Sequence, residues 1–125
     1  MILDTNAVSA ILAGDTLLEA ILPAGKRQHL PVIVIGEYLF GMLGSKRRKK
    51  LEMGFGLLES QSIVVPSDRA TAGIYAAIRH GLILKGRPIP ENDLWIAALA
   101  RQHSLEIVSQ DSHFDQVEGI RRISW

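Results

Sequence analysis

Four acidic residues in this sequence are placed where a hydrolytic centre could be built from carboxylates. Asp4 and Asp111 each stand just past a short apolar run that is predicted to be a strand. Glu37 and Asp93 lie near the starts of two predicted helices. Because functional groups gather outside the carboxyl ends of parallel strands, we expect all four side chains to converge at one edge of a sheet.

Converging carboxylates repel one another unless protons or cations neutralise them. Two like charges about 4 Å apart cost ~4 kcal/mol at an effective dielectric constant near 20. The chain has no cysteine, and its four histidines show no metal-binding spacing such as His-x-x-x-His. Ligands that are nearly all oxygen suit Mg²⁺ or Mn²⁺, which also accept substrate phosphate. The pattern therefore predicts metal-dependent hydrolysis of a phosphodiester.

Each of the four acids alone also has a structural explanation. Asp4 and Asp111, at strand ends, are typical N-cap residues. Asp93, in the first turn of a helix, interacts favourably with the helix dipole. Glu37 lies in an apolar region, where a solvated charge is less expected. The expected convergence of all four residues favours a catalytic centre over four separate structural roles.

Short apolar strands alternate with helices along the chain. The predicted strands are residues 1–3, 29–34, 63–65, 105–108 and 120–124. The predicted helices are residues 7–13, 17–22, 45–59, 68–82 and 91–103, with a further helix beginning near residue 37. This alternation predicts an α/β fold with a mainly parallel central sheet and helices on both faces. No linker or repeat divides the sequence, so we expect a single domain over residues 1–125.

Composition excludes several classes of protein. The 125 residues are 47% hydrophobic and 22% charged, which predicts a globular core rather than disorder. The net charge of +1 gives the whole molecule no electrostatic preference for nucleic acid. The absence of cysteine excludes disulfides and thiolate chemistry. No apolar run approaches membrane-spanning length and no leader is recognisable, so we expect a cytoplasmic protein without membrane contact.

Other folds that use strand-end acids or phosphate loops do not match. Haloacid-dehalogenase-type phosphatases need Asp-x-Asp after the first strand, where this chain has Asp4-Thr5-Asn6. Receiver domains need an acidic pair there and a lysine after a late strand, and neither is present. The chain also has no G-x-x-x-x-G-K-[ST] loop and no G-x-S-x-G nucleophile elbow.

Four sequence blocks resemble those of the PIN-domain ribonucleases, and in particular the VapC toxins of bacterial toxin–antitoxin pairs. The blocks are Met1–Asn6, Gly36–Gly41, Asn92–Ala98 and Ser109–Phe114. They follow the order and spacing of that family from residue 1 to about residue 124. The resemblance implies a PIN-like fold and a Mg²⁺- or Mn²⁺-dependent endoribonuclease. It also implies a cognate VapB antitoxin that holds the enzyme inactive, and usually a homodimer.

By position in these blocks, the resemblance assigns the metal-binding role to Asp4, Glu37, Asp93 and Asp111. The chain departs from the family in two places. Ser109-Gln110-Asp111 stands where the family often has Thr-x-Asp, so a hydroxyl is retained. The segment before Glu37 is entirely apolar, whereas the family often carries Ser or Thr there. A polar contact that the family makes near the site is therefore not expected from this segment.

Five further residues near these acids have two possible roles each. Thr5 and Ser109 could donate hydroxyl hydrogen bonds to the metal-binding carboxylates, or cap a helix or turn. Asn6 could cap a helix or contact substrate. Asp115 would share a helical face with the acid four residues before it and could contact the metal through water; otherwise it is a solvated carboxylate. For His113 we expect a surface or hydrogen-bonded imidazole rather than catalysis.

Five of the fourteen basic residues are consecutive. They are Lys46, Arg47, Arg48, Lys49 and Lys50. Cations at the start of a helix oppose its dipole, so this placement needs another reason. Contacts to the phosphates of RNA would be one, and a solvated helix face is the alternative.

Two other functions remain open from the sequence. One is a PIN nuclease that acts in RNA maturation or on structured DNA, against which the short chain without further domains argues. The other is a non-catalytic PIN module that only binds a partner, against which the four retained acids argue. The sequence does not identify the RNA that would be cleaved.

Overall fold

A five-stranded sheet lies at the centre of the computed structural model, which describes residues 1–125. The strands are β1 (Ile2–Leu3), β2 (His29–Pro31), β3 (Ile63–Val65), β4 (Ile107–Val108) and β5 (Arg122–Ile123). They stand in the order β3-β2-β1-β4-β5, and every neighbouring pair is parallel. β1 is therefore central, with Ile2 aligned to His29 on one side and to Ile107 on the other.

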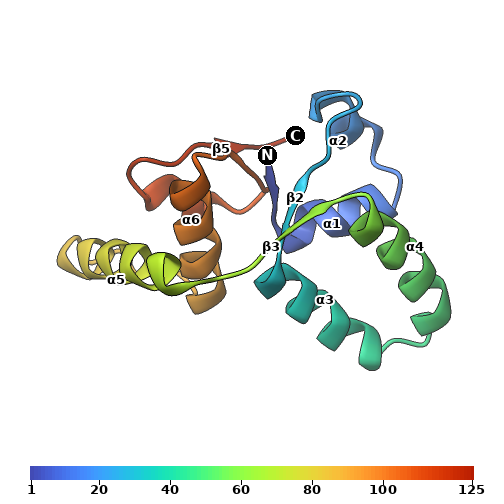
Figure 1. Ribbon diagram of the computed structural model, residues 1–125, viewed down its shortest axis with the longest axis horizontal. Coiled ribbons are helices and arrows are strands. Elements are labelled where there is room, and N and C mark those ends of the chain that lie inside the picture. Colours follow the sequence, from blue (N-terminus) through green and yellow to red (C-terminus); the bar gives the residue numbers. More distant parts are fainter.

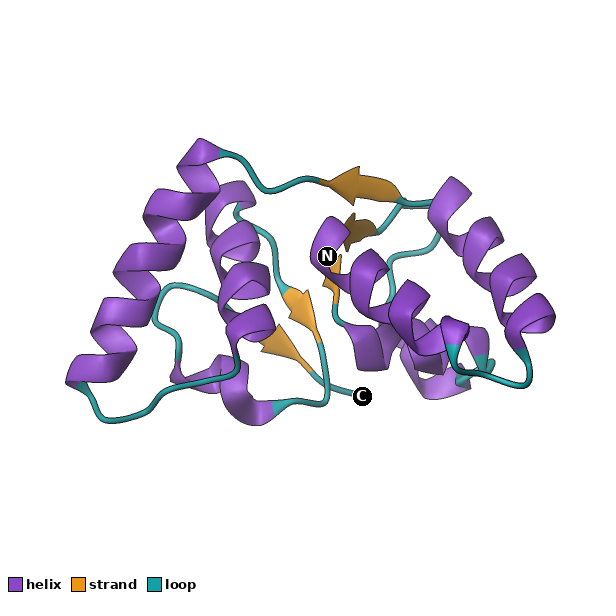
Figure 2. Ribbon diagram, turned by 90° about the horizontal axis from the view of Figure 1, so that it is seen from below, coloured by secondary structure: helices purple, strands orange, loops and turns teal.

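Six α-helices and one short 3₁₀ helix surround the strands. The helices are α1 (Thr5–Leu12), α2 (Thr16–Ile21), α3 (Val32–Leu43), α4 (Arg48–Ser60), α5 (Arg69–Leu84), α6 (Glu91–His103) and the 3₁₀ helix η1 (Ser112–Gln116). Figures 1 and 2 show α5 and α6 to one side of the strands and α1, α3 and α4 to the other. The predicted α/β fold with a parallel sheet and helices on both faces is confirmed. None of these helices combines the length and the apolar character needed to cross a membrane.

One predicted strand proves to be half helix. The expected strand over residues 29–34 ends at Pro31, and α3 begins at Val32 rather than near residue 37. A short apolar run does not distinguish a buried strand from the first turn of a helix by periodicity, which explains the error. The helix turns Val34 into the core and leaves Val32 exposed.

Two helices also begin at residues other than those expected. α1 begins at Thr5 rather than at residue 7, since the Asp4 side chain accepts a hydrogen bond from the Thr5 amide. α4 begins at Arg48 rather than at residue 45, so part of the basic segment precedes the helix. The predicted strand at residues 63–65 and the predicted helix at residues 91–103 are confirmed with their boundaries.

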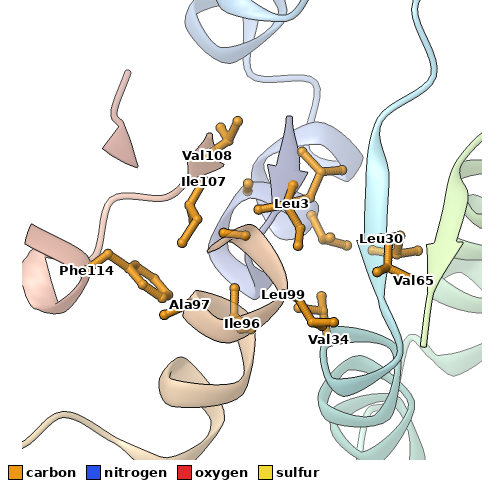
Figure 3. Packing of buried hydrophobic residues seen from close by; sticks show 14 of the residues in the cluster. Leu3, Leu30, Val34, Val65, Ile96, Ala97, Leu99, Ile107, Val108 and Phe114 are labelled. Carbon is orange, nitrogen blue, oxygen red and sulfur yellow. The ribbon is translucent and has the colours of Figure 1, made fainter. Parts of the chain in front are cut away.

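The core joins the two central strands to α6. The β1 and β4 side chains are fully buried, and so is nearly every residue of α6 from Ile96 to Ala100. Figure 3 shows Leu3 and Ile107 lying close to Ile96 and Leu99. Close packing of this kind leaves little freedom for the elements involved. The ends of β1, β4 and α6 are therefore fixed relative to one another.

Leu99→Ala should lower the free energy of unfolding by about 2–5 kcal/mol, because it leaves a cavity beneath the sheet. Leu57→Ala is the matched control, since Leu57 lies on α4 with 60% of its surface exposed. Its expected effect is within about 0.5 kcal/mol. Urea denaturation measures both. Equal losses in the two variants would contradict the central position of α6.

Candidate active site

Each of the four predicted acids is delivered by a different element. Asp4 directly follows β1 and caps α1, and Asp111 follows β4 and caps η1. Asp93 is the third residue of α6, and Glu37 lies in the second turn of α3. Asp4 and Asp111 thus have the capping role that the sequence allowed, and the same two side chains also face the other acids. The two explanations are compatible.

These four residues, named here the acidic cluster, converge as expected. The negative charges of Glu37 and Asp111 act on Asp4, and those of Asp4 and Asp111 act on Asp93. The Nδ1 atom of His113 lies 2.8 Å from Asp111 Oδ1 and 3.1 Å from Asp93 Oδ2. One ligand atom from each of these last three side chains lies within 4.8 Å of the others.

The carboxylate of Asp4 is held by a buried hydrogen-bond network. Ser109 Oγ donates to Asp4 Oδ2 over 2.6 Å, and Asn6 Nδ2 donates to the same oxygen over 3.1 Å. Ser109 Oγ in turn accepts the amide of Asp111 at 2.9 Å. The side-chain oxygen of Asn6 accepts the Gln110 amide. The network joins the end of β1 to the end of β4, so Ser109 supplies the hydroxyl that the family often takes from Thr.

A second hydroxyl orients Glu37. Thr5 Oγ1, in the first turn of α1, donates to Glu37 Oε2 over 2.6 Å. The apolar segment before Glu37 offers no hydroxyl of its own. The polar contact to this glutamate therefore comes from α1, which fixes α1 and α3 relative to each other at the site.

Burial and neighbouring charges shift the pKa values of Asp4 and Asp93. Burial raises the pKa of Asp4, and the charges of Glu37 and Asp111 raise it further, against the hydrogen bonds from Ser109 and Thr5. Burial also raises the pKa of Asp93 to about 6. The hydrogen bond from His113 opposes this shift, and the neighbouring carboxylates add to it. The centre has more negative charge than its own hydrogen bonds satisfy, which suits a bound cation.

His113 contributes more to the site than the sequence suggested. Its side chain is 48% exposed and hydrogen-bonded, as expected, but it bonds to Asp93 and lies beside Asp111, two residues of the acidic cluster. Phe114 beside it is buried in the core. The signal in the sequence was the spacing of two residues from Asp111, because η1 turns the chain back over that carboxylate.

Asp115 lies outside the cluster. Its two carboxylate oxygens accept hydrogen bonds from Arg122 at 2.8 and 2.7 Å. The expectation that it shares a face with Asp111 assumed an α-helix, in which residues four apart are neighbours. The segment is a 3₁₀ helix with three residues per turn, so the side chain points elsewhere. Arg122 also donates to the backbone carbonyl of Ser109, so the Asp115–Arg122 ion pair is connected to a residue that binds Asp4.

The basic segment, defined as Lys46–Lys50, spans the loop after α3 and the first turn of α4. All five residues are exposed and together line an open pocket. Within the segment, Arg48 Nε lies 2.6 Å from Glu52 Oε1, so this charge is paired. The structure leaves the other four side chains without an acidic partner.

The parallel α/β fold and the acidic cluster at its sheet edge agree with the PIN-domain class that the sequence predicted. Comparison with known proteins supports the same class. The sequence model of the PIN domain family matches residues 1–120. The chain belongs to this family, as the four sequence blocks predicted.

Individual proteins within and beyond this family comparison are also similar to the chain. The chain is 32% identical to Ribonuclease VapC5 of Mycobacterium tuberculosis over 120 residues, which cover 94% of this chain and 87% of that protein. The solved VapBC-5 structure from the same organism superposes with a TM-score of 0.74 at 30% identity, covering 98% of this chain and 94% of the other. VapBC2 of Rickettsia felis, solved with a promoter DNA fragment, gives a TM-score of 0.90 at 20% identity over 99% and 97% of the chains, a likeness of fold.

The metal-free protein should lose stability as the pH rises from about 4 to above 6. The pKa of Asp93 rises from 3.8 in the unfolded chain to about 6 in the fold. Between these values the folded state holds a proton that the unfolded state has released, so raising the pH favours unfolding. Asp93→Asn should reduce this loss. Urea denaturation in EDTA across this pH range measures it, with Glu19→Gln as a control on the exposed surface of α2. An unchanged pH dependence in Asp93→Asn would contradict the burial of this carboxylate.

Proposed function

We propose that this protein is a metal-dependent endoribonuclease and the toxin of a VapBC-type toxin–antitoxin pair. The observation that carries the proposal is the acidic cluster, in which four carboxylates from four elements are crowded at one sheet edge. The relative that covers most of the chain is named a ribonuclease, which supports RNA as the substrate. A second relative, from Neisseria gonorrhoeae, is named Toxin FitB.

The donor set fits Mg²⁺ or Mn²⁺. Asp4, Glu37, Asp93 and Asp111 offer oxygen ligands, and His113 adds one nitrogen beside two of them. A divalent cation bound here would polarise the phosphoryl oxygen and lower the pKa of a bound water. Oxygen-rich sites of this kind select such ions over those that prefer thiolate or several imidazoles.

The remaining residues of the site position these ligands. Ser109 and Asn6 hold one oxygen of Asp4, and Thr5 holds one oxygen of Glu37. Outer hydrogen bonds of this kind fix the orientation of a ligand and are worth roughly 10–100-fold in metal affinity or activity. The imidazole of His113 is hydrogen-bonded to Asp93, and its backbone amide donates to Asp111 Oδ1, so this residue contacts both acids.

A cognate VapB-type antitoxin is the proposed partner. Several of the structures that resemble this chain are described as VapBC complexes, including one from Salmonella typhimurium bound to DNA. The chain has apolar side chains available for a partner on α3, where Leu39, Phe40 and Leu43 are exposed. We further propose that the toxin is a homodimer of single-domain chains, residues 1–125, and acts in the cytoplasm, where its RNA substrate would lie.

The two alternative functions receive less support. In a non-catalytic PIN module, the repulsion within the acidic cluster would be destabilising and would serve no reaction. In this protein, hydrogen bonds orient the carboxylates of Asp4 and Glu37. A nuclease of RNA maturation would use the same chemistry, and the relative named Toxin FitB favours the first proposal over it.

Asp4→Asn and Asp93→Asn should each lower the rate of RNA cleavage in Mg²⁺ or Mn²⁺ by more than about 100-fold, because each removes a proposed metal ligand. Both variants should fold, and in EDTA they should be at least as stable as the wild type, since one repelling charge is lost. Cleavage of transfer, ribosomal and messenger RNA, read on gels, measures the activity.

Glu19→Gln is the control for these two variants. It removes one exposed carboxylate from α2 and should cleave as the wild type does. If Asp4→Asn and Asp93→Asn instead melted far below the wild type in EDTA, their carboxylates would be structural caps. If they cleaved normally, the proposed function would fail.

A further inference from the structure

Two adjoining cavities lie between the acidic cluster and the basic segment. One cavity is lined by Thr5 and Glu37 at the cluster and extends along Ser9, Tyr38 and Leu51. The adjoining cavity is lined by the same last three residues and reaches Arg47 and Lys50. The two cavities share three lining residues and adjoin between α1, α3 and α4; together they are named the groove here.

Packing contacts join the helices that form this groove. The ring of Tyr38 stacks on Phe55 with centroids 4.8 Å apart and planes 9° from parallel. At Gly54, α4 packs against α1, and a Cβ there would meet the Leu12 side chain at 3.4 Å. Lys50, in the first turn of α4, lines the far end of the groove.

The groove divides the basic segment into two sets. Arg47 and Lys50, three residues apart and on one face of the helix start, line the groove. Lys46, Arg48 and Lys49 do not line it, and Arg48 is paired with Glu52. Nothing in the sequence distinguishes these residues from one another, and only the helix start at Arg48 separates them.

We propose that this groove holds the single-stranded RNA beside the scissile phosphate, with Arg47 and Lys50 binding two backbone phosphates. The inference rests on the proposed ribonuclease function, and it assigns a path to the substrate. A polyanion suits both ends of the groove: its scissile phosphate lies at the acidic end, where a cation would bind, and its next phosphates meet unpaired cations. An acidic peptide would suit only the basic end.

The test compares two double variants that each remove two positive charges from the same segment. Arg47→Gln/Lys50→Gln removes the charges in the groove, and Arg48→Gln/Lys49→Gln is the matched control. A fluorescein-labelled single-stranded RNA of randomised sequence is the probe. Its binding is measured by fluorescence anisotropy in EDTA, which prevents metal-dependent cleavage, over a series of salt concentrations.

The magnitude of the salt slope should fall by ~1.4 in the groove variant, at ~0.7 for each phosphate of a single strand that the protein no longer neutralises. It should change little in the control variant. Arg47→Lys/Lys50→Arg retains both charges and should retain the slope, which separates loss of charge from loss of fold. Equal reductions in the groove and control variants, or no reduction in either, would overturn the inference.

Two further outcomes separate this inference from the proposed function. If the wild type cleaves RNA in Mg²⁺ or Mn²⁺ while the groove variant binds RNA like the control, the RNA path is wrong and the ribonuclease stands. If the wild type cleaves no RNA, the proposed function itself fails. Unaltered RNA binding combined with lost binding of the antitoxin would assign the groove to the partner and overturn the RNA path.

Discussion

Repulsion among carboxylates is the constraint around which this molecule is arranged. Asp4, Glu37, Asp93 and Asp111 would separate if their side chains were free, and burial makes the charged forms of Asp4 and Asp93 still less favourable. They stay together because β1, β4 and α6 share one packed core, whose buried side chains fix the ends of these elements. The stability of the core is thus used to hold a site that is unfavourable on its own and favourable with a cation.

Hydrogen bonds then convert this crowding into a defined arrangement. Ser109 and Asn6 join the ends of the two central strands through one oxygen of Asp4, and Thr5 joins α1 to α3 through Glu37. The same helices, α1 and α3, form the groove with α4. One set of elements therefore orients the acids and shapes the proposed path of the substrate, so catalysis and RNA binding would depend on the same packing.

The sequence predicted the parts of this structure that depend on local chemistry and strand order. Alternating strands and helices indicated a parallel sheet, and that topology alone was enough to expect Asp4 and Asp111 at one edge. The start of α3 was missed because the apolar run Val32–Ile35 is compatible with either a buried strand or a buried helix turn. The ion pair of Asp115 and the contacts of His113 depend on the 3₁₀ geometry of η1, and the division of the basic segment depends on how α4 packs on α1. These are tertiary features that spacing along one chain does not encode.

The most direct test of a cation site at the acidic cluster is the thermal stability of the wild type and of Asp93→Asn as Mn²⁺ is added at pH 7. A cation that binds only the folded acidic cluster stabilises it by RT ln(1 + [L]/Kd), or about 2.7 kcal/mol at one hundred times Kd. The Tm of the wild type should rise with the concentration of Mn²⁺, and the Tm of Asp93→Asn should rise much less. A wild-type Tm that does not respond to Mn²⁺, or an equal rise in both proteins, would contradict the assignment of these carboxylates as metal ligands.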